Sequence, residues 1–430
     1  MPLEDHPLRF MLANELHARP FPQLAAPAQV AYLAIKPETD AARRDRARDR
    51  AHLDALLDRF GAAHPAPGAT HHVADLGRFR LKWESHTEFV SYTVFQPGLG
   101  ARPFDPEVFA AFPADWLDEA PGLRITSAIL RVDAIPAREA DLNEGFGDWF
   151  VQESVACSRV ADGAAIVASD FRIDSAGHMR MGVFVPPGIG PRRLGRIVQW
   201  LCEIETYKSM SMLGFARARQ LSPRIGELDT RLSQLVGDLS GSATPPDGTL
   251  RALLGISSEL ENLLAKSSFR FSATEAYQAI VHERIDVLRE DRVFGRQTLG
   301  EFMLRRFDPA MRTVKASDAR LRSLSERSMR AGTLLSTRVD VDRSAQNQML
   351  LESMDRRADM QLRLQRTVEG LSVVAISYYA VGLVGNVAEP FALPLGLTKG
   401  WLLALLTPPV VVAVWFLVHR IRERLTAAPS

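Results

Sequence analysis

The sequence predicts an α+β protein whose N-terminal domain has a mixed, mostly antiparallel sheet with helices. Segments with strand-like alternation recur up to about residue 188. Apolar residues at helical spacing dominate from residue 191 onward, and two uncharged apolar runs lie near the end. We therefore expect three regions: a cytoplasmic α+β domain at 1–188, a helical region with a long stalk helix at 189–368, and a transmembrane hairpin with a basic tail at 369–430.

The first domain begins with a short helix at 7–18, because Pro7 suits the first helical position and Leu8, Leu12 and Leu16 recur at helical spacing. An Arg/Asp-rich helix is expected at 41–60. Alternating segments predict strands at 30–35, 79–85, 88–95, 124–135, 164–173 and 179–186.

The helical region opens at Pro191 and is interrupted at 241–248 by GSATPPDG. Helices are expected at 250–266 and 272–307. No proline occurs between Pro309 and Pro390, which predicts a very long helix from about residue 310 into the first apolar run. Leu321, Leu324 and Leu335 give a heptad pattern that Arg338 and Asp342 interrupt, which favours packing against the preceding helices over a two-stranded coiled coil.

The apolar runs, 371–388 and 401–418, are each long enough to cross a bilayer's hydrocarbon core as a helix. Arginines flank the outer ends of the pair, whereas the connecting loop holds only Lys399. The positive-inside bias then places both termini in the cytoplasm and the loop outside, in a two-span inner-membrane protein. No secretory signal opens the chain.

Polar and small residues inside these runs indicate packing against protein as well as lipid. Tyr378 and Tyr379 fall in the middle of the first run, near Ser377, and Pro408 and Pro409 interrupt the second. Buried hydroxyls and carbonyls freed by proline need partners, so we expect a homo-oligomer.

Composition limits the function classes. The 430 residues carry 52 Lys+Arg and 51 Asp+Glu, so overall charge does not indicate nucleic-acid binding. Cys157 and Cys202 form no paired-cysteine motif, which fits a reducing compartment without a disulfide framework or zinc site. HExxH and GxSxG are absent, and the sequence identifies no catalytic residue and no cofactor. We therefore expect a protein that is not an enzyme.

The densest group of functional side chains is NELHARPFP, with Asn14, Glu15, His17 and Arg19. These residues are a candidate polar cluster that holds an anion or moves a proton. The alternative is local and structural: Glu15 and Arg19 are an i, i+4 pair, and the prolines end the helix before the first strand. We favour the structural role.

Two other groups of residues invite functional interpretations. His64, His71, His72 and His86 lie near one another in the sequence, and His64 and the His71-His72 pair flank a Pro/Gly-rich turn, which favours solvated loop histidines over a metal site. GIGPRRLG, at 188–195, lacks the phosphate-binding signatures and is interpreted as a helix start.

Two stretches, HPLRFMLANELHARPFPQLAAPAQVAYLAI at 6–35 and the segment 334–385, resemble a bacterial family of membrane-anchored proteins, the domain-of-unknown-function family 3422. The resemblance covers essentially the whole chain. It implies a membrane anchor and assigns no activity, cofactor or catalytic residue.

The layout is also similar to CorA-type divalent-cation channels. In that family a Gly-Met-Asn motif ends the first span; here Gly385 and Asn386 are adjacent, without the methionine. The resemblance implies an external pore mouth of Gly385, Asn386 and Glu389, with a divalent cation as partner. Three hypotheses follow: a non-enzymatic, oligomeric membrane-anchored protein, which we favour; a CorA-like channel; and a membrane-tethered enzyme using His17 and Arg19.

Overall fold

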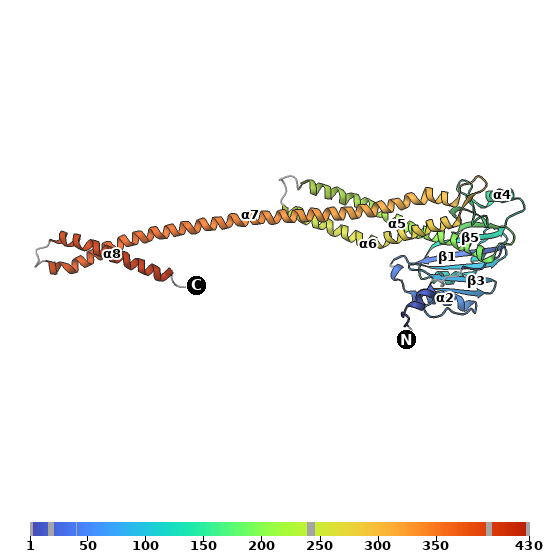
Figure 1. Ribbon diagram of the computed structural model, residues 1–430, viewed down its shortest axis with the longest axis horizontal. Coiled ribbons are helices and arrows are strands. Elements are labelled where there is room, and N and C mark those ends of the chain that lie inside the picture. The colour runs from blue at the N-terminus through green and yellow to red at the C-terminus, as the bar shows by residue number, and fades with distance from the viewer. Residues whose placement is uncertain (1–2, 16–20, 40, 239–245, 393–397, 427–430) are drawn as a thin grey trace. The chain divides into compact units, whose positions relative to one another are not determined.

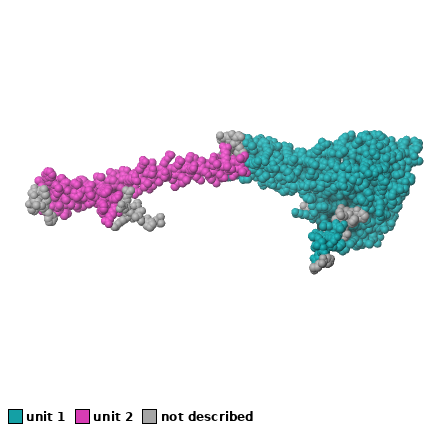
Figure 2. Space-filling model, viewed as in Figure 1, with its two compact units in different colours: residues 1–244, 251–332 teal, residues 245–250, 333–430 magenta. Residues whose placement is uncertain are grey.

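A computed structural model describes residues 3–15, 21–39, 41–238, 246–392 and 398–426. The chain divides into two compact units, which Figure 2 colours separately. Unit 1 comprises residues 1–244 and 251–332, and unit 2 comprises residues 245–250 and 333–430. The predicted α+β class is confirmed, because a mixed sheet precedes long helices and two apolar C-terminal helices.

In unit 1 the described residues form a nine-stranded sheet of order β2-β3-β4-β1-β5-β8-β7-β6-β9. Neighbouring strands are antiparallel except β5 and β8, which run parallel. The strands are β1 (Ala28–Lys36), β2 (His71–Leu76), β3 (Phe79–Ser85), β4 (Val90–Pro97), β5 (Leu123–Ala134), β6 (Ala156–Val160), β7 (Ala165–Ile173), β8 (Met179–Val185) and β9 (Asp291–Arg292).

One face of the sheet carries the main hydrophobic core. Alternate residues of the central strands, such as Leu81, Trp83 and Tyr92, are buried there with Trp116 and Phe146. The elements that contribute to this core or flank it are α2 (Arg46–Arg59), η2 (Pro106–Ala111), α3 (Ala114–Asp118) and α4 (Glu139–Trp149), and η1 (Ala41–Arg43) precedes α2. Burial of these large side chains supplies most of the driving force for folding this domain.

The opposite face of the sheet is covered by α5 (Pro191–Asp238), as Figure 1 shows. Strand residues on this face are more polar and include Lys82, Glu84, Ser91 and Thr93, which are nevertheless buried. Both faces of the sheet are therefore covered.

Within unit 1, α5, α6 (Pro246–Leu288) and the first part of α7 (Leu299–Ala392) run side by side (Figure 1). Arg224 of α5 donates two hydrogen bonds to the Glu259 carboxylate of α6, of 2.5 and 2.7 Å. Arg320 and Arg327 of α7 both contact Asp229 of α5. Leu321, Leu324 and Leu335 are buried, as expected for packing against the preceding helices.

The start of α7 differs from the prediction. The expected helix at 272–307 is helical up to Leu288 and again from Leu299, but its continuity is wrong. Residues 289–298 separate α6 from α7, and the backbone there enters the left-handed region at Arg289, Phe294 and Gly295. Thr298 and Glu301 then form a reciprocal capping box of 3.1 and 3.0 Å. From Leu299 the helix is continuous into the first apolar run, which confirms the predicted long helix.

The loop placement of His71 and His72 is also wrong, because both belong to β2 and pair with β3. Strands β2, β6 and β9 and helices α3 and α4 were not predicted. These elements are short, and their sequences lack the sustained alternation or helical periodicity that marks the others.

Unit 2 contains the C-terminal part of α7 and α8 (Lys399–Thr426), which turns back along it (Figure 1). Among the described residues, α7 and α8 are the two helices long and apolar enough to cross a membrane. Every residue from 340 to 368 of α7 is exposed. This segment therefore has no packing partner within the described chain.

Candidate functional sites

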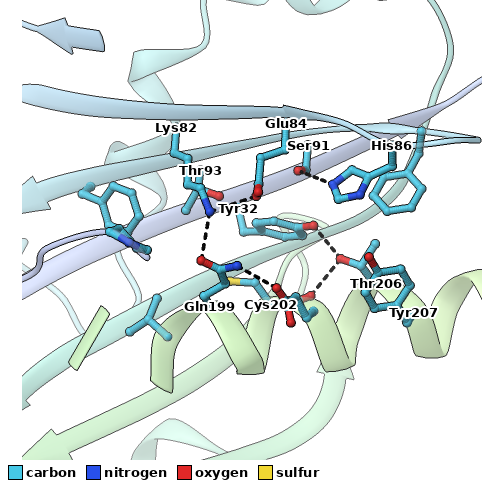
Figure 3. Close-up of a pocket in the computed structure, with 15 residues that line it drawn as sticks. Tyr32, Lys82, Glu84, His86, Ser91, Thr93, Gln199, Cys202, Thr206 and Tyr207 are labelled. Atoms are coloured by element: carbon cyan, nitrogen blue, oxygen red, sulfur yellow. Dashed lines mark hydrogen bonds and ion pairs between the residues drawn. The ribbon is translucent and has the colours of Figure 1, made fainter. Parts of the chain in front are cut away.

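A pocket in unit 1 lies between the polar face of the sheet and α5 (Figure 3). Strands β1, β3 and β4 supply Tyr32, Lys82, Glu84, Ser91 and Thr93. Helix α5 supplies Val198, Gln199, Cys202, Glu203, Thr206 and Tyr207. These residues meet because strand alternation turns every second side chain toward the helix, while residues at i, i+3 and i+4 of α5 share one face.

A chain of charged and polar groups crosses this pocket. The Lys82 ammonium lies 3.1 Å from the Glu84 carboxylate and donates a 2.9 Å hydrogen bond to the amide oxygen of Gln199. The Gln199 amide nitrogen donates to Glu203, at 2.7 Å, and Arg284 of α6 lies 2.5 Å from the other oxygen of that carboxylate. The network thus links the sheet to α5 and α6.

The second half of the pocket holds neutral groups. The Tyr32 and Thr206 hydroxyls are 2.6 Å apart, and Thr206 also lies within hydrogen-bond distance of the Cys202 carbonyl oxygen, at 2.8 Å. Burial raises the pKa of the Tyr32 phenol well above its usual value. Burial, reinforced by the Glu203 carboxylate, also raises the pKa of the Cys202 thiol. Both groups are therefore protonated at neutral pH, which disfavours nucleophilic chemistry by this cysteine.

The pocket is narrow. Its cavity volume is about 20 Å³, enough for about one water molecule. The polar network and this small volume favour a role in fixing α5 on the sheet.

A larger cavity, of about 760 Å³, lies in unit 2 between the apolar parts of α7 and α8. Valines and leucines of both helices dominate its lining, and Ser377, Asn386 and Thr407 add polar groups. Ser377 is only 5% exposed, yet its hydroxyl has no hydrogen-bond partner among the described residues. We call this cavity the hairpin groove.

The predicted pore-mouth residues Gly385, Asn386 and Glu389 all lie in the C-terminal part of α7. A Cβ added at Gly385 would stand 2.6 Å from Cδ2 of Leu403, so this glycine permits close approach of α7 and α8. Asn386 lines the hairpin groove, and the Glu389 carboxylate lies 2.9 Å from the Lys399 ammonium. The channel hypothesis and its cation partner stay predictions.

The predicted cluster in NELHARPFP cannot be traced as a site. Asn14 and Glu15 belong to α1 (Arg9–Glu15), but their side chains, and His17 and Arg19 entirely, lie outside the described residues. Immediately beyond them, Pro22 lines the pocket beside α5. The anion-binding, proton-transfer and structural interpretations of the cluster all stay predictions.

The histidines that were considered as metal ligands have separate partners. His64 lies 2.7 Å from Asp58, His72 bonds the Ala63 carbonyl at 2.9 Å, and His86 contacts Ser91 at 3.3 Å. Among the described residues, no group of three or more His, Cys, Asp or Glu side chains is arranged to hold a metal.

Sequence reasoning missed the network around Lys82 and Glu84. Their alternation with Leu81 and Trp83 was visible, but it is also typical of a strand with one face in water. Only the position of α5, more than a hundred residues later, shows that this face is covered.

The family model described as "Protein of unknown function (DUF3422)" matches residues 4–425. No curated protein matches the chain in a sequence search.

Proposed function

The chain belongs to the DUF3422 family, described as of unknown function, and from this premise we propose that it is a protein of the bacterial inner membrane, anchored by α7 and α8. Its α+β body then lies in the cytoplasm and acts by presenting a binding surface, without catalysis.

The observation that carries this proposal is the exposure of the two apolar helices. In each of them, only 11% of the most apolar stretch is buried inside the chain. A core helix of a soluble protein buries such a stretch, because exposed apolar area costs about 25 cal/mol per Å² in water. Two such helices in tandem, joined by a short loop, match a hairpin that returns across a bilayer.

The pocket in unit 1 supports a structural role for the polar groups of the body. Lys82, Gln199 and Glu203 are paired with one another or with neighbouring helices, and the cavity is the size of one water molecule. Buried polar groups that satisfy one another fix packing and orientation.

Cysteine labelling tests the anchor and its orientation. Single variants Lys399→Cys, at the start of α8, and Arg420→Cys, beyond its apolar stretch, are treated in spheroplasts with a membrane-impermeant maleimide. Both native cysteines are buried, so the background labelling is low. We expect Lys399→Cys to react in intact spheroplasts and Arg420→Cys to react only after the membrane is permeabilised.

Arg356→Cys, on the exposed part of α7 that precedes the first apolar run, is the matched control and should behave like Arg420→Cys. Equal labelling of Lys399→Cys and Arg420→Cys before permeabilisation would contradict the hairpin.

A further inference from the structure

We draw no further inference here: the strongest candidate, the hairpin groove between the apolar parts of α7 and α8, is an exposed apolar surface, and nothing in the part of the chain that the structure describes shows what covers it.

Discussion

The Lys82 ammonium and the Glu84 carboxylate lie 3.1 Å apart on β3, with only 4% and 11% of their side chains exposed. Removing one member of such a pair leaves a buried charge uncompensated. We expect Lys82→Met to lower the free energy of unfolding by about 3–5 kcal/mol, measured by denaturant titration in detergent. The double variant Lys82→Met/Glu84→Leu should lose clearly less than the sum of the single changes.

Arg80 and Asp75 supply the control for this cycle, because Arg80 lies on the same strand and its partner is 4.0 Å away with both side chains exposed. Arg80→Met should change stability by less than about 1 kcal/mol. Additive effects of Lys82→Met and Glu84→Leu would show that the two charges do not interact.

The second prediction concerns Glu290, which tethers the start of α7. Its carboxylate accepts hydrogen bonds from the Ser158 hydroxyl, at 2.6 Å, and from the backbone N–H groups of Leu299 and Gly300, at 3.1 and 2.7 Å. Burial raises the pKa of this carboxyl group. Glu290→Ala removes the acceptor of the Ser158 hydroxyl and of the Gly300 N–H, whereas the Leu299 N–H keeps the Ser158 hydroxyl oxygen at 3.0 Å. We therefore expect a loss of about 1–3 kcal/mol and faster amide hydrogen exchange in the first turn of α7.

Glu283→Ala is the matched control, because this exposed carboxylate pairs only at the surface with Arg284 among its described contacts. Its exchange pattern at the start of α7 should equal that of the unmodified chain. Unaltered exchange in Glu290→Ala would mean that the capping box of Thr298 and Glu301 suffices alone.

The third prediction is a pH dependence set by two buried histidines. Burial lowers the pKa of His52, whose ring nitrogens contact the Tyr92 hydroxyl and the Trp116 carbonyl at 3.0 Å each. Burial, reinforced by Arg124, also lowers the pKa of His178. Below the ordinary histidine pKa of about 6.5, the unfolded chain therefore binds protons that the folded chain does not.

The stability that depends on these two histidines is present above about pH 6.5. It is lost as the pH falls through their lowered pKa values in the folded state. We expect the melting temperature in detergent to drop between pH 7 and 5, and the drop to shrink in His52→Gln. An undiminished drop in that variant would assign the effect to other groups.

Local sequence pattern predicted the elements whose signal is strong in a single segment. Strands β1, β3 and β5 follow their apolar alternation. The two apolar helical stretches near the C-terminus follow from composition alone, because each is a long run without charged residues. The start of α7 was placed about ten residues late, although the Thr298-x-x-Glu301 capping box is visible in the sequence.

The candidate sites depend on contacts between distant segments and were predictable only in part. Lys82 meets Gln199 because α5 covers the sheet, and no pattern within β3 specifies that cover. That Tyr378 and Ser377 need protein partners stays a prediction, and the groove itself arises from how α8 packs on α7 at Gly385.

Sedimentation of the full-length chain tests the central claim, that α7 and α8 cross a bilayer, most directly. Lysed cells are ultracentrifuged without detergent, and the membrane pellet is then washed at alkaline pH, which strips peripheral proteins. We predict that the chain stays in the washed pellet and dissolves only with detergent. Recovery of the folded chain in the supernatant of either step would contradict the account.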